Sequence, residues 1–329
     1  MIASDTGGRQ QAVFFVAGVQ VTVRTTTPVS LRFVTDALVG RDRYIEDVST
    51  ATASWTIDIV SHLRDEALPL EWAWTDNVVA DEGVELRCDQ QNRTITVLCN
   101  EERWALLWRV GLSIPPWERA APLRPILDNV FGSAGLTMVH GGTLGIDGRA
   151  VLISAIGGSG KSTCVVGGIR RGMTTVGDDF ILLDPSPVEP NIASTVRGLY
   201  QTARLHRTSP AWSPADVEPP DVHEQWGHDD KSLVLVNGRY PGALVDAQRI
   251  HAIVVPEVGH DAPSLTPMGR MDALRAVLPS SFVLADRRPE SFYRITEFVR
   301  STPTYRLRLC SDTERNAAAI ENFLAHECP

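Results

Sequence analysis

One stretch of the sequence, LISAIGGSGKSTCVVGG at residues 152–168, restricts the fold more than any other part of the chain. An apolar run typical of a buried strand leads into a glycine-rich turn, and a pattern typical of a helix follows it. Gly160, Lys161 and Ser162 match the end of the pattern G-x-x-x-x-G-K-[ST], and Ala155 stands in place of its first glycine. The order of strand, glycine turn and helix predicts an α/β domain.

A glycine-rich turn of this kind can bind phosphate because its backbone N–H groups converge and the helix N-terminus adds about half a positive charge. Lys161 can reach the β- and γ-phosphates, and the Ser162 hydroxyl can ligate Mg²⁺. The alternative is a tight strand-to-helix turn that happens to contain a lysine, but the Lys-Ser pair at the start of the helix favours a nucleotide site. The predicted nucleotide-binding residues are Ala155, Gly157, Gly158, Ser159, Gly160, Lys161, Ser162 and Thr163.

An acidic pair, Asp178 and Asp179, follows the predicted helix and precedes the short apolar run FILL. Adjacent carboxylates are common in solvated turns, and by themselves these two would be interpreted in that way. Beside a phosphate loop, one carboxylate can hold a metal ion while the other accepts a proton from an attacking hydroxyl. The pair is therefore a candidate catalytic centre.

The segment HGGTLGIDGRAVLISAIGGSGKSTCVVGGIRRGMTTVGDDFILLD resembles the catalytic core of the HPr kinase/phosphorylase family. In that family a His-Gly pair, a strand, the phosphate loop, a helix ending in Arg-Gly and an Asp-Asp pair follow at this spacing. The resemblance extends over residues 140–329 with decreasing strength. It implies a P-loop-containing mixed sheet flanked by helices, related to phosphoenolpyruvate carboxykinase.

The resemblance also implies roles for individual residues. Lys161 and Ser162 would hold phosphates and Mg²⁺, Asp178 would be the base toward the acceptor hydroxyl, and Asp179 would support the metal. His140 would sit beside Asp178 and orient it or tune its proton affinity. The alternative for His140 is a histidine at a strand edge whose polar atoms are satisfied by backbone groups.

The sequence departs from the family in its later part. The family's Glu-x-Arg-Gly stretch, whose glutamate helps to bind metal, is approximated by STVRGLY at residues 194–200. Thr195 stands where the glutamate would be, whereas Arg197 and Gly198 match. The loop linked to phosphorolysis is not recognisable, so phosphorylase activity is less expected than kinase activity.

Beyond the glycine turn, the sequence predicts the remaining elements of this half. Gly167 and Gly168 lie inside the predicted helix, where each costs about 1 kcal/mol relative to alanine, so we expect them to allow close packing on the sheet. The predicted strands are residues 149–155, 180–184, 250–258 and 304–309, and the predicted helices are residues 162–172, 290–300 and 314–326.

The N-terminal part alternates apolar and polar residues and predicts short strands. Trp104 and Trp108 are spaced one helical turn apart and predict a core-facing helical stripe. The proline-rich residues 113–125 predict a domain boundary. We expect a smaller α+β accessory domain over residues 1–120 and the catalytic domain over residues 121–329. The predicted strands are residues 12–25, 54–60, 84–88 and 94–98, the last two joined by a hairpin loop at residues 89–93.

Composition excludes several classes of function. The net charge of −9 argues against a protein that works by neutralising nucleic-acid phosphates or by lying on anionic lipid. No apolar run reaches the roughly 18 residues that a membrane span needs. The five cysteines contain no C-x-x-C pair, so neither a disulfide framework nor a zinc knuckle is indicated, and we expect a cytoplasmic location.

The phosphate loop, the acidic pair and the family resemblance together predict a phosphotransferase that uses ATP and Mg²⁺ and has an alcohol group as acceptor. The resemblance implies a serine as acceptor, either of an HPr-like carrier protein or of a ribosomally made precursor peptide, and the divergent N-terminal part favours an acceptor other than HPr. The alternatives are a small-molecule alcohol kinase and a non-catalytic nucleotide-binding regulator. Residues 209–230 form the one long loop-like segment and are expected near the phosphate loop. The resemblance also makes a homo-oligomer possible, because relatives commonly assemble, but the sequence leaves the oligomeric state open.

Overall fold

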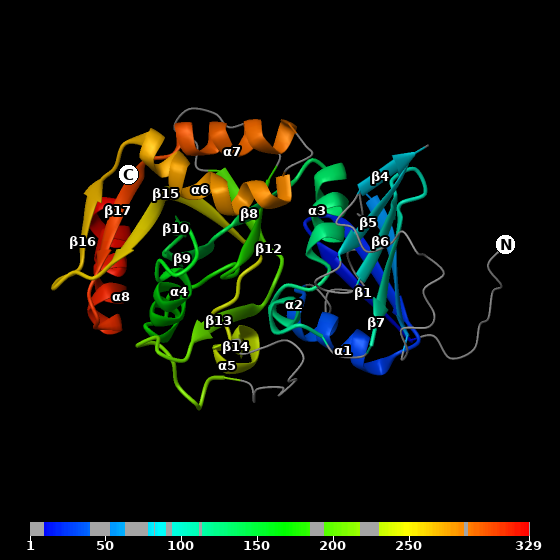
Figure 1. Cartoon of the computed structure of the whole chain (residues 1–329). Helices are drawn as coiled ribbons and strands as arrows, with labels where there is room; N and C mark the ends of the chain where they lie inside the picture. Colours follow the sequence, from blue (N-terminus) through cyan, green and yellow to red (C-terminus); the bar gives the residue numbers. More distant parts are fainter. Residues whose placement is uncertain are drawn as a thin grey trace. The chain divides into compact units, whose positions relative to one another are not determined.

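The structure is a computed structural model that describes residues 10–39, 53–62, 78–81, 83–89, 94–111, 114–184, 194–217, 230–285 and 289–328. Its internal contacts divide the chain into two compact units, Met1–Ala134 and Gly135–Pro329 (Figure 1). The two short helices Pro116–Ala120 and Arg124–Ser133, which begin within the proline-rich segment, therefore group with the first unit.

The described strands of the first unit form a seven-stranded mixed sheet in the order β1-β2-β3-β7-β6-β5-β4. Strand β3 runs parallel to β2 and to β7, and the other neighbours are antiparallel. The strands are β1 Gln10–Val16, β2 Val19–Thr25, β3 Ala53–His62, β4 Val78–Asp81, β5 Val84–Asp89, β6 Thr94–Cys99 and β7 Trp104–Val110. The helices are α1 Pro28–Ala37, α2 Pro116–Ala120 and α3 Arg124–Ser133.

Two predictions for this unit need correction. Residues 12–25 form a hairpin rather than one strand, because Ala17 and Gly18 turn the chain with φ angles of 52° and 80°. Trp104 and Trp108 lie on strand β7, not on a helix, and Ala105 is buried between its neighbours. Residues four apart share a face of a helix and also a face of a strand, so the tryptophan spacing fits either structure. Hydrogen-bond pairing of these residues with β3 and β6 makes the segment a strand. The predicted strands 54–60, 84–88 and 94–98 are confirmed; of the predicted hairpin loop, residues 90–93 lie outside the described residues.

The described strands of the second unit form an eight-stranded mixed sheet, in which β16-β17-β15-β12-β11-β8 are neighbours and β10 pairs with β15 and β9. A separate hairpin consists of β13 and β14. The strands are β8 Thr137–His140, β9 Gly142–Ile146, β10 Arg149–Ile153, β11 Phe180–Leu183, β12 Ser194–Gly198, β13 Thr202–His206, β14 Lys231–Leu235, β15 Ala247–Val258, β16 Ser264–Pro267 and β17 Thr304–Leu309. The helices are α4 Lys161–Arg170, α5 Val236–Arg239, α6 Arg270–Ala285, α7 Pro289–Ser301, α8 Thr313–Asn322 and the π-helical turn η5 Phe323–Glu327.

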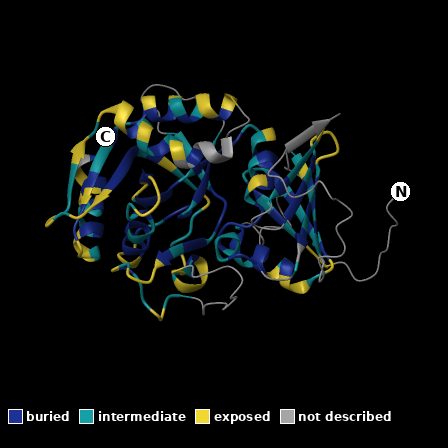
Figure 2. Cartoon of the chain, in the orientation of Figure 1, coloured by how far each residue is buried: buried dark blue, intermediate teal, exposed yellow. Residues whose placement is uncertain are grey.

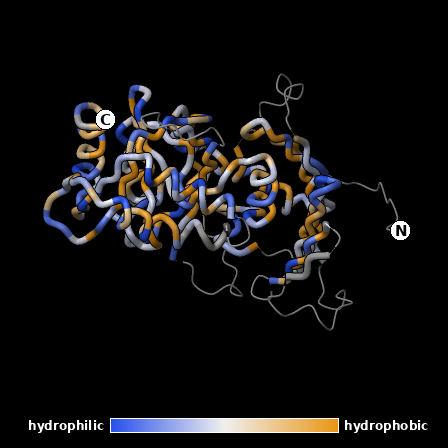
Figure 3. The backbone as a smooth tube through the Cα atoms, turned by 90° about the horizontal axis from the view of Figure 1, so that it is seen from above, coloured by the Kyte–Doolittle hydropathy of each residue, from blue (hydrophilic) through white to orange (hydrophobic). Residues whose placement is uncertain are grey.

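Helices cover both faces of this sheet because its strands carry apolar residues on both sides. Val151 and Ile153 of β10 pack in a core shared with α4 and α8, whereas Leu152 packs in a second core shared with α6 and α7. In Figure 2 the strands are mainly buried and the outer turns of α6 and α7 are exposed. Hydrophobic stretches alternate with polar ones along the backbone (Figure 3). The predicted mixed sheet flanked by helices is confirmed at this level.

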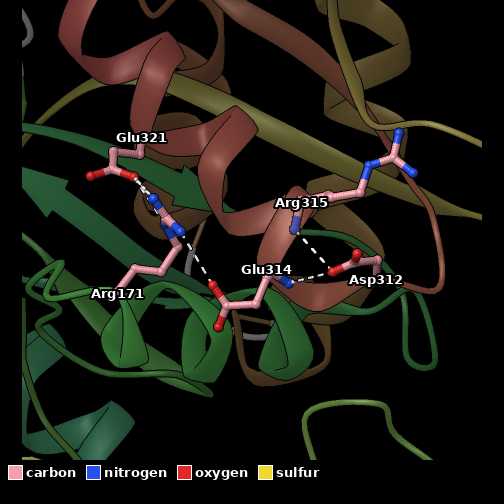
Figure 4. Close-up of polar contacts among 5 residues, drawn as sticks. All are labelled: Arg171, Asp312, Glu314, Arg315 and Glu321. Atoms are coloured by element: carbon pink, nitrogen blue, oxygen red, sulfur yellow. Dashed lines mark hydrogen bonds and ion pairs between the residues drawn. The ribbon is translucent and has the colours of Figure 1, made fainter.

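Helix α8 is held on α4 by polar contacts at the surface (Figure 4). The Arg171 guanidinium donates to the carboxylates of Glu314 at 3.2 Å and Glu321 at 2.5 Å. The Asp312 carboxylate caps α8 by accepting hydrogen bonds from the backbone N–H groups of Glu314 and Arg315. These contacts fix α8 beside the helix that begins at the glycine turn.

The predicted strands and helices of this half agree with the structure. Strands β10, β11, β15 and β17 and helices α4 and α7 match the predicted ranges, with ends that differ by up to three residues, and α8 matches its range together with the π-helical turn η5. Gly172 follows α4 with a φ of 88°, as a helix-ending glycine does. Among the described residues, no helix combines the length and the apolarity needed to cross a membrane.

Candidate functional site

The glycine turn lies at the carboxyl edge of the parallel part of the sheet. Strand β10 runs parallel to β15, and β15 runs parallel to β17, so their carboxyl ends meet at one edge. In α/β sheets, ligands bind in the loops at this edge. Contacts of Gly160 place the glycine turn at this edge. A Cβ atom there would lie 2.8 Å from Cδ1 of Leu309, the last residue of β17, and 3.3 Å from Cγ1 of Val258, the last residue of β15.

The backbone of the turn needs its glycines. Gly158 and Gly160 have φ angles of 80° and 96°, which residues with side chains rarely adopt. A Cβ atom at Gly157 or Gly158 would meet nothing within 4 Å, so this part of the turn faces open space. The turn is therefore shaped so that an approaching group can reach its backbone.

Lys161 begins α4 and turns its side chain back onto the turn. Its Nζ donates to the carbonyl oxygens of Ala155 at 2.7 Å and Ile156 at 3.1 Å. The side chain is only 8% exposed, and this burial lowers the pKa of the ammonium group, although Asp178 and Asp179 act in the opposite direction. The structure thus places a buried cation directly beneath the glycine turn.

Asp178 is the most unusual residue of the site. It is 2% exposed, and its carboxylate accepts hydrogen bonds from the Ser162 hydroxyl and the Arg204 backbone N–H. Its Oδ1 atom is buried without a hydrogen-bond partner among the described residues. Burial, and then the charge of Asp179, raise the pKa of Asp178 to about 7, although Ser162 and Lys161 lower it. A buried carboxylate oxygen without a partner has lost its hydration, so a group that donates to it or coordinates it would be favoured there.

His140 and Asp179 form a second contact of the site. Strands β8 and β11 pair so that His140 stands opposite Phe180, and the two rings stack with centroids 5.0 Å apart. This register brings His140 Nε2 within 3.0 Å of Asp179 Oδ1. The resemblance implied a position beside Asp178, but the hydrogen bond of this histidine goes to the neighbouring aspartate.

Two contacts of the site involve residues that the sequence did not indicate. Gly142 allows β9 to approach the acidic pair, because a Cβ atom there would lie 2.9 Å from the Asp178 carbonyl oxygen. The HGG run that contains Gly142 was the available signal. Arg204 donates a hydrogen bond to Asp178 through its backbone N–H. Because almost every residue type has a backbone N–H, the sequence could not indicate this contact.

The described part of the segment 209–230 begins beside the glycine turn. The hydroxyls of Ser209 and Thr163 are 2.8 Å apart, and Arg170 of α4 donates to the Ala211 carbonyl at 2.7 Å and to Asp216 at 2.5 Å. Residues 218–229 lie outside the described residues. Ser209 therefore lies near the turn as expected, whereas Ala211 and Asp216 contact the last residue of α4, at the end away from the turn.

The donors for a metal ion are few. Thr195 lies on β12, and Arg197 donates to Asp184 at 3.0 Å. Within the described ranges, no three His, Cys, Asp or Glu residues are grouped to hold a metal ion. Mg²⁺ usually takes one or two carboxylates and completes its shell with phosphates and water. Ser162, whose hydroxyl donates to Asp178, and the carboxylate of the adjacent Asp179 fit this requirement.

Comparisons with known proteins give little further information. No protein-family model matches the chain, and no curated protein matches it. Among solved structures, the chain is similar to the Hpr(Ser) kinase/phosphatase from Coxiella burnetii, with 14% identity and a TM-score of 0.31. That match covers 56% of this chain and 95% of the other. A match this distant decides neither the fold nor the activity.

Proposed function

We propose that the chain is a kinase that transfers the γ-phosphoryl group of Mg-ATP to a hydroxyl, most readily a serine of a protein or of a ribosomally made precursor peptide. The observation that carries this proposal is the environment of Asp178. Its buried carboxylate accepts a hydrogen bond from Ser162, in the first turn of α4, and its Oδ1 atom has no partner among the described residues. This carboxylate could therefore receive a proton beside a phosphate bound at the glycine turn.

The glycine turn would hold the nucleotide. Backbone N–H groups at residues 157–162 and the positive end of α4 favour phosphate oxygens, and Lys161 adds its charge. Mg²⁺, when bound, would neutralise the charge that develops on the phosphates. Ser162 and Asp179 would hold the Mg²⁺ ion. The hydrogen bond from the Ser162 hydroxyl to Asp178 places the Asp178 carboxylate next to the metal position.

Asp178 would act as the general base. The acceptor oxygen forms a bond to the γ-phosphorus, the bond from that phosphorus to the β–γ bridging oxygen breaks, and the acceptor proton passes to Asp178 Oδ1. Burial raises the pKa of the Asp178 carboxyl group in the free protein, which makes its carboxylate a stronger proton acceptor. His140 would position the pair through its hydrogen bond to Asp179.

Two other functions use the same residues. A nucleotide-gated regulator would keep the glycine turn but has no need of a buried second carboxylate, so Asp178 favours the kinase. A small-molecule alcohol kinase would use the same base. The contact between Ser209 and Thr163 favours a larger acceptor, because it holds the described start of this segment, residues 209–217, against α4 beside the site.

Incubation with γ-labelled ATP, Mg²⁺ and candidate acceptors, followed by mass spectrometry, tests the proposal. The acceptors are an HPr-like carrier protein, serine-containing precursor peptides and small alcohols. We expect label on a peptide or protein serine with the wild-type chain, and a loss of roughly 100-fold or more with Asp178→Asn at nearly unchanged ATP affinity. Label on a free alcohol alone would exclude the peptide version. If wild-type protein binds Mg-ATP but labels no acceptor, the regulator is the better description.

A further inference from the structure

Val258, the last residue of β15, is an exposed apolar side chain next to the glycine turn. Residues two apart on a strand share a face, so Val258 lies on the same face of the sheet as Val254, which packs in the core that contains α4. Val254 is fully buried, whereas Val258 is 57% exposed. The apolar row on this face of β15 therefore continues beyond the buried core and ends beside the turn.

Contacts at the edge of the sheet fix the position of Val258. A Cβ atom at Gly160 would lie 3.3 Å from its Cγ1 atom. The backbone N–H of His260 donates to the carbonyl oxygen of Leu309 at 3.0 Å, which holds the chain after β15 to the end of β17. The charged neighbour Glu257 belongs to the opposite face of the strand. Val258 therefore presents an apolar surface directly at the glycine turn.

A second exposed apolar side chain belongs to the turn itself. Ile156 is 60% exposed, and its carbonyl oxygen accepts a hydrogen bond from Lys161. Strands β10 and β15 run parallel, and Ile153 and Val254 are the last pair in their register. Ile156 and Val258 both follow that pair, so they lie at the same edge of the sheet. Both would be removed from water by a ligand with an apolar group beside its phosphates.

The order of strands around the turn gives a bound nucleotide its direction. Strand β10 lies between β9 and β15. The acidic pair is on the β9 side, since a Cβ atom at Gly142 would lie 2.9 Å from the Asp178 carbonyl oxygen. Under the proposed function the γ-phosphate lies beside Asp178, so the α-phosphate and the nucleoside extend toward the β15 side. Val258 borders the turn on that side.

We infer that Val258 and Ile156 form the nucleoside subsite, and that the base and ribose of the bound nucleotide cover their exposed apolar surface. This inference rests on the proposed function, because the position of the phosphates determines which part of the ligand reaches β15. The glycine turn binds the phosphates, and apolar contact at the end of β15 adds the affinity that distinguishes a nucleotide from free polyphosphate.

Two ligands that share the phosphates test this subsite. They are Mg-ATP and Mg-tripolyphosphate, which has three phosphates and no nucleoside, and isothermal titration calorimetry on the full chain measures both dissociation constants. We expect Val258→Ser to weaken Mg-ATP binding by roughly 3- to 10-fold, the scale for losing the apolar contact of one partly covered valine side chain. Binding of Mg-tripolyphosphate should stay the same, because Val258 lies outside the phosphate-binding turn.

Two control variants separate the subsite from a general change of the protein. Met271→Ser removes an apolar side chain that is 64% exposed on α6, which packs on the other face of the sheet, and it should affect neither ligand. Lys161→Ala should weaken both ligands, because both carry the phosphates. Equal weakening of the two ligands by Val258→Ser, or no effect on either, would contradict the subsite.

The wild-type chain separates this inference from the proposed function. Equal affinity for Mg-ATP and Mg-tripolyphosphate would mean that the nucleoside contributes nothing, and it would contradict the subsite while leaving the phosphate site in place. Failure of the wild-type chain to bind either ligand would overturn the proposed function together with the subsite.

Discussion

Asp178 shows how a single residue can determine what a site does. Its carboxylate is buried, stands next to a second carboxylate, and has one oxygen without a partner among the described residues. Each of these features costs stability in the free protein, because a buried ionised group has lost its hydration. Residues kept in such surroundings are often functional, since a bound ligand can recover the cost. Lys161 is the complementary case, a buried cation satisfied by two carbonyl oxygens.

The nucleotide site can be tested through Lys161. We expect millimolar Mg-ATP to raise the melting temperature of the wild-type chain, because a ligand that binds only the folded state stabilises it by mass action. Lys161→Ala should lose most of that increase, since the variant lacks the buried ammonium group that faces the turn. Differential scanning fluorimetry with and without Mg-ATP measures both. A wild-type melting temperature indifferent to Mg-ATP would remove the basis of the nucleotide site.

The raised pKa of Asp178 predicts a pH dependence of stability in the free protein. Because burial raises the folded-state pKa of Asp178 to about 7, above its ordinary value of 3.8, the folded state binds the proton more tightly than the unfolded state. The wild-type chain therefore loses stability as the pH rises between these two values. In EDTA and without nucleotide, Asp178→Asn should be more stable than wild type at pH 8 by about 1–3 kcal/mol, and the difference should shrink at pH 5.

Urea unfolding at both pH values measures this difference, with the exposed residue Asp261 as a matched control through Asp261→Asn. That control should unfold like the wild type at both pH values. A stability gain in Asp178→Asn that is the same at pH 5 and pH 8 would mean that the carboxyl group does not titrate as its burial implies.

Helix α4 shows how one element joins the site to the core. Its first turn carries Lys161 and Ser162, and its later turns carry two consecutive glycines, where sequence reasoning expects close packing. The structure distinguishes the two. A Cβ atom at Gly168 would lie 2.5 Å from Cδ1 of Leu144, which is fully buried, whereas at Gly167 the nearest atom would be 3.6 Å away. Only Gly168 is required by packing.

Alanine substitutions should therefore have opposite effects at the two positions. Gly168→Ala should lower stability by about 1–3 kcal/mol, because Leu144 has no room to move within the core. Gly167→Ala should be neutral or stabilising by up to about 1 kcal/mol, since alanine is the better helix former and its methyl group fits. Thermal unfolding of the two variants decides the matter, and equal destabilisation by both would show that the packing of α4 differs from the one described.

At the scale of the whole molecule, the named site residues all lie in the unit Gly135–Pro329. The first unit has its own seven-stranded sheet and its own buried residues. Sequence reasoning placed the start of the catalytic domain at residue 121, whereas the contacts group α2 and α3 with the first unit. The division into an accessory and a catalytic domain remains a prediction.

A fragment of residues 135–329 tests that prediction. We expect it to fold and to show the same stabilisation by Mg-ATP as the full chain, because the glycine turn, the acidic pair and the hairpin of β13 and β14 are all within it. Circular dichroism establishes folding, and the melting temperature with and without Mg-ATP establishes binding. A folded fragment that ignores Mg-ATP, while the full chain responds, would place part of the nucleotide site in the first unit. A fragment that does not fold would contradict the division itself.

The sequence determined those features that depend on neighbouring residues. The glycine turn, the start of α4 at Lys161 and its end near Gly172 follow from local hydrophobic patterns and from the backbone freedom of glycine. The identity of the candidate residues followed in the same way, because their chemistry is a property of residue type. At Trp104–Val110 the local pattern fitted both a helix and a strand, and the helix that the sequence predicted there was wrong.

Only the tertiary structure decided which of these residues meet. Because β8 pairs with β11, His140 forms its hydrogen bond with Asp179 rather than with Asp178. The position of β13 brings the backbone N–H of Arg204 to Asp178. It also decided that Gly168 and not Gly167 lies against the core. Register and packing join residues far apart in the chain, and their free energies depend on all the partners at once, so no local pattern in the sequence contains them.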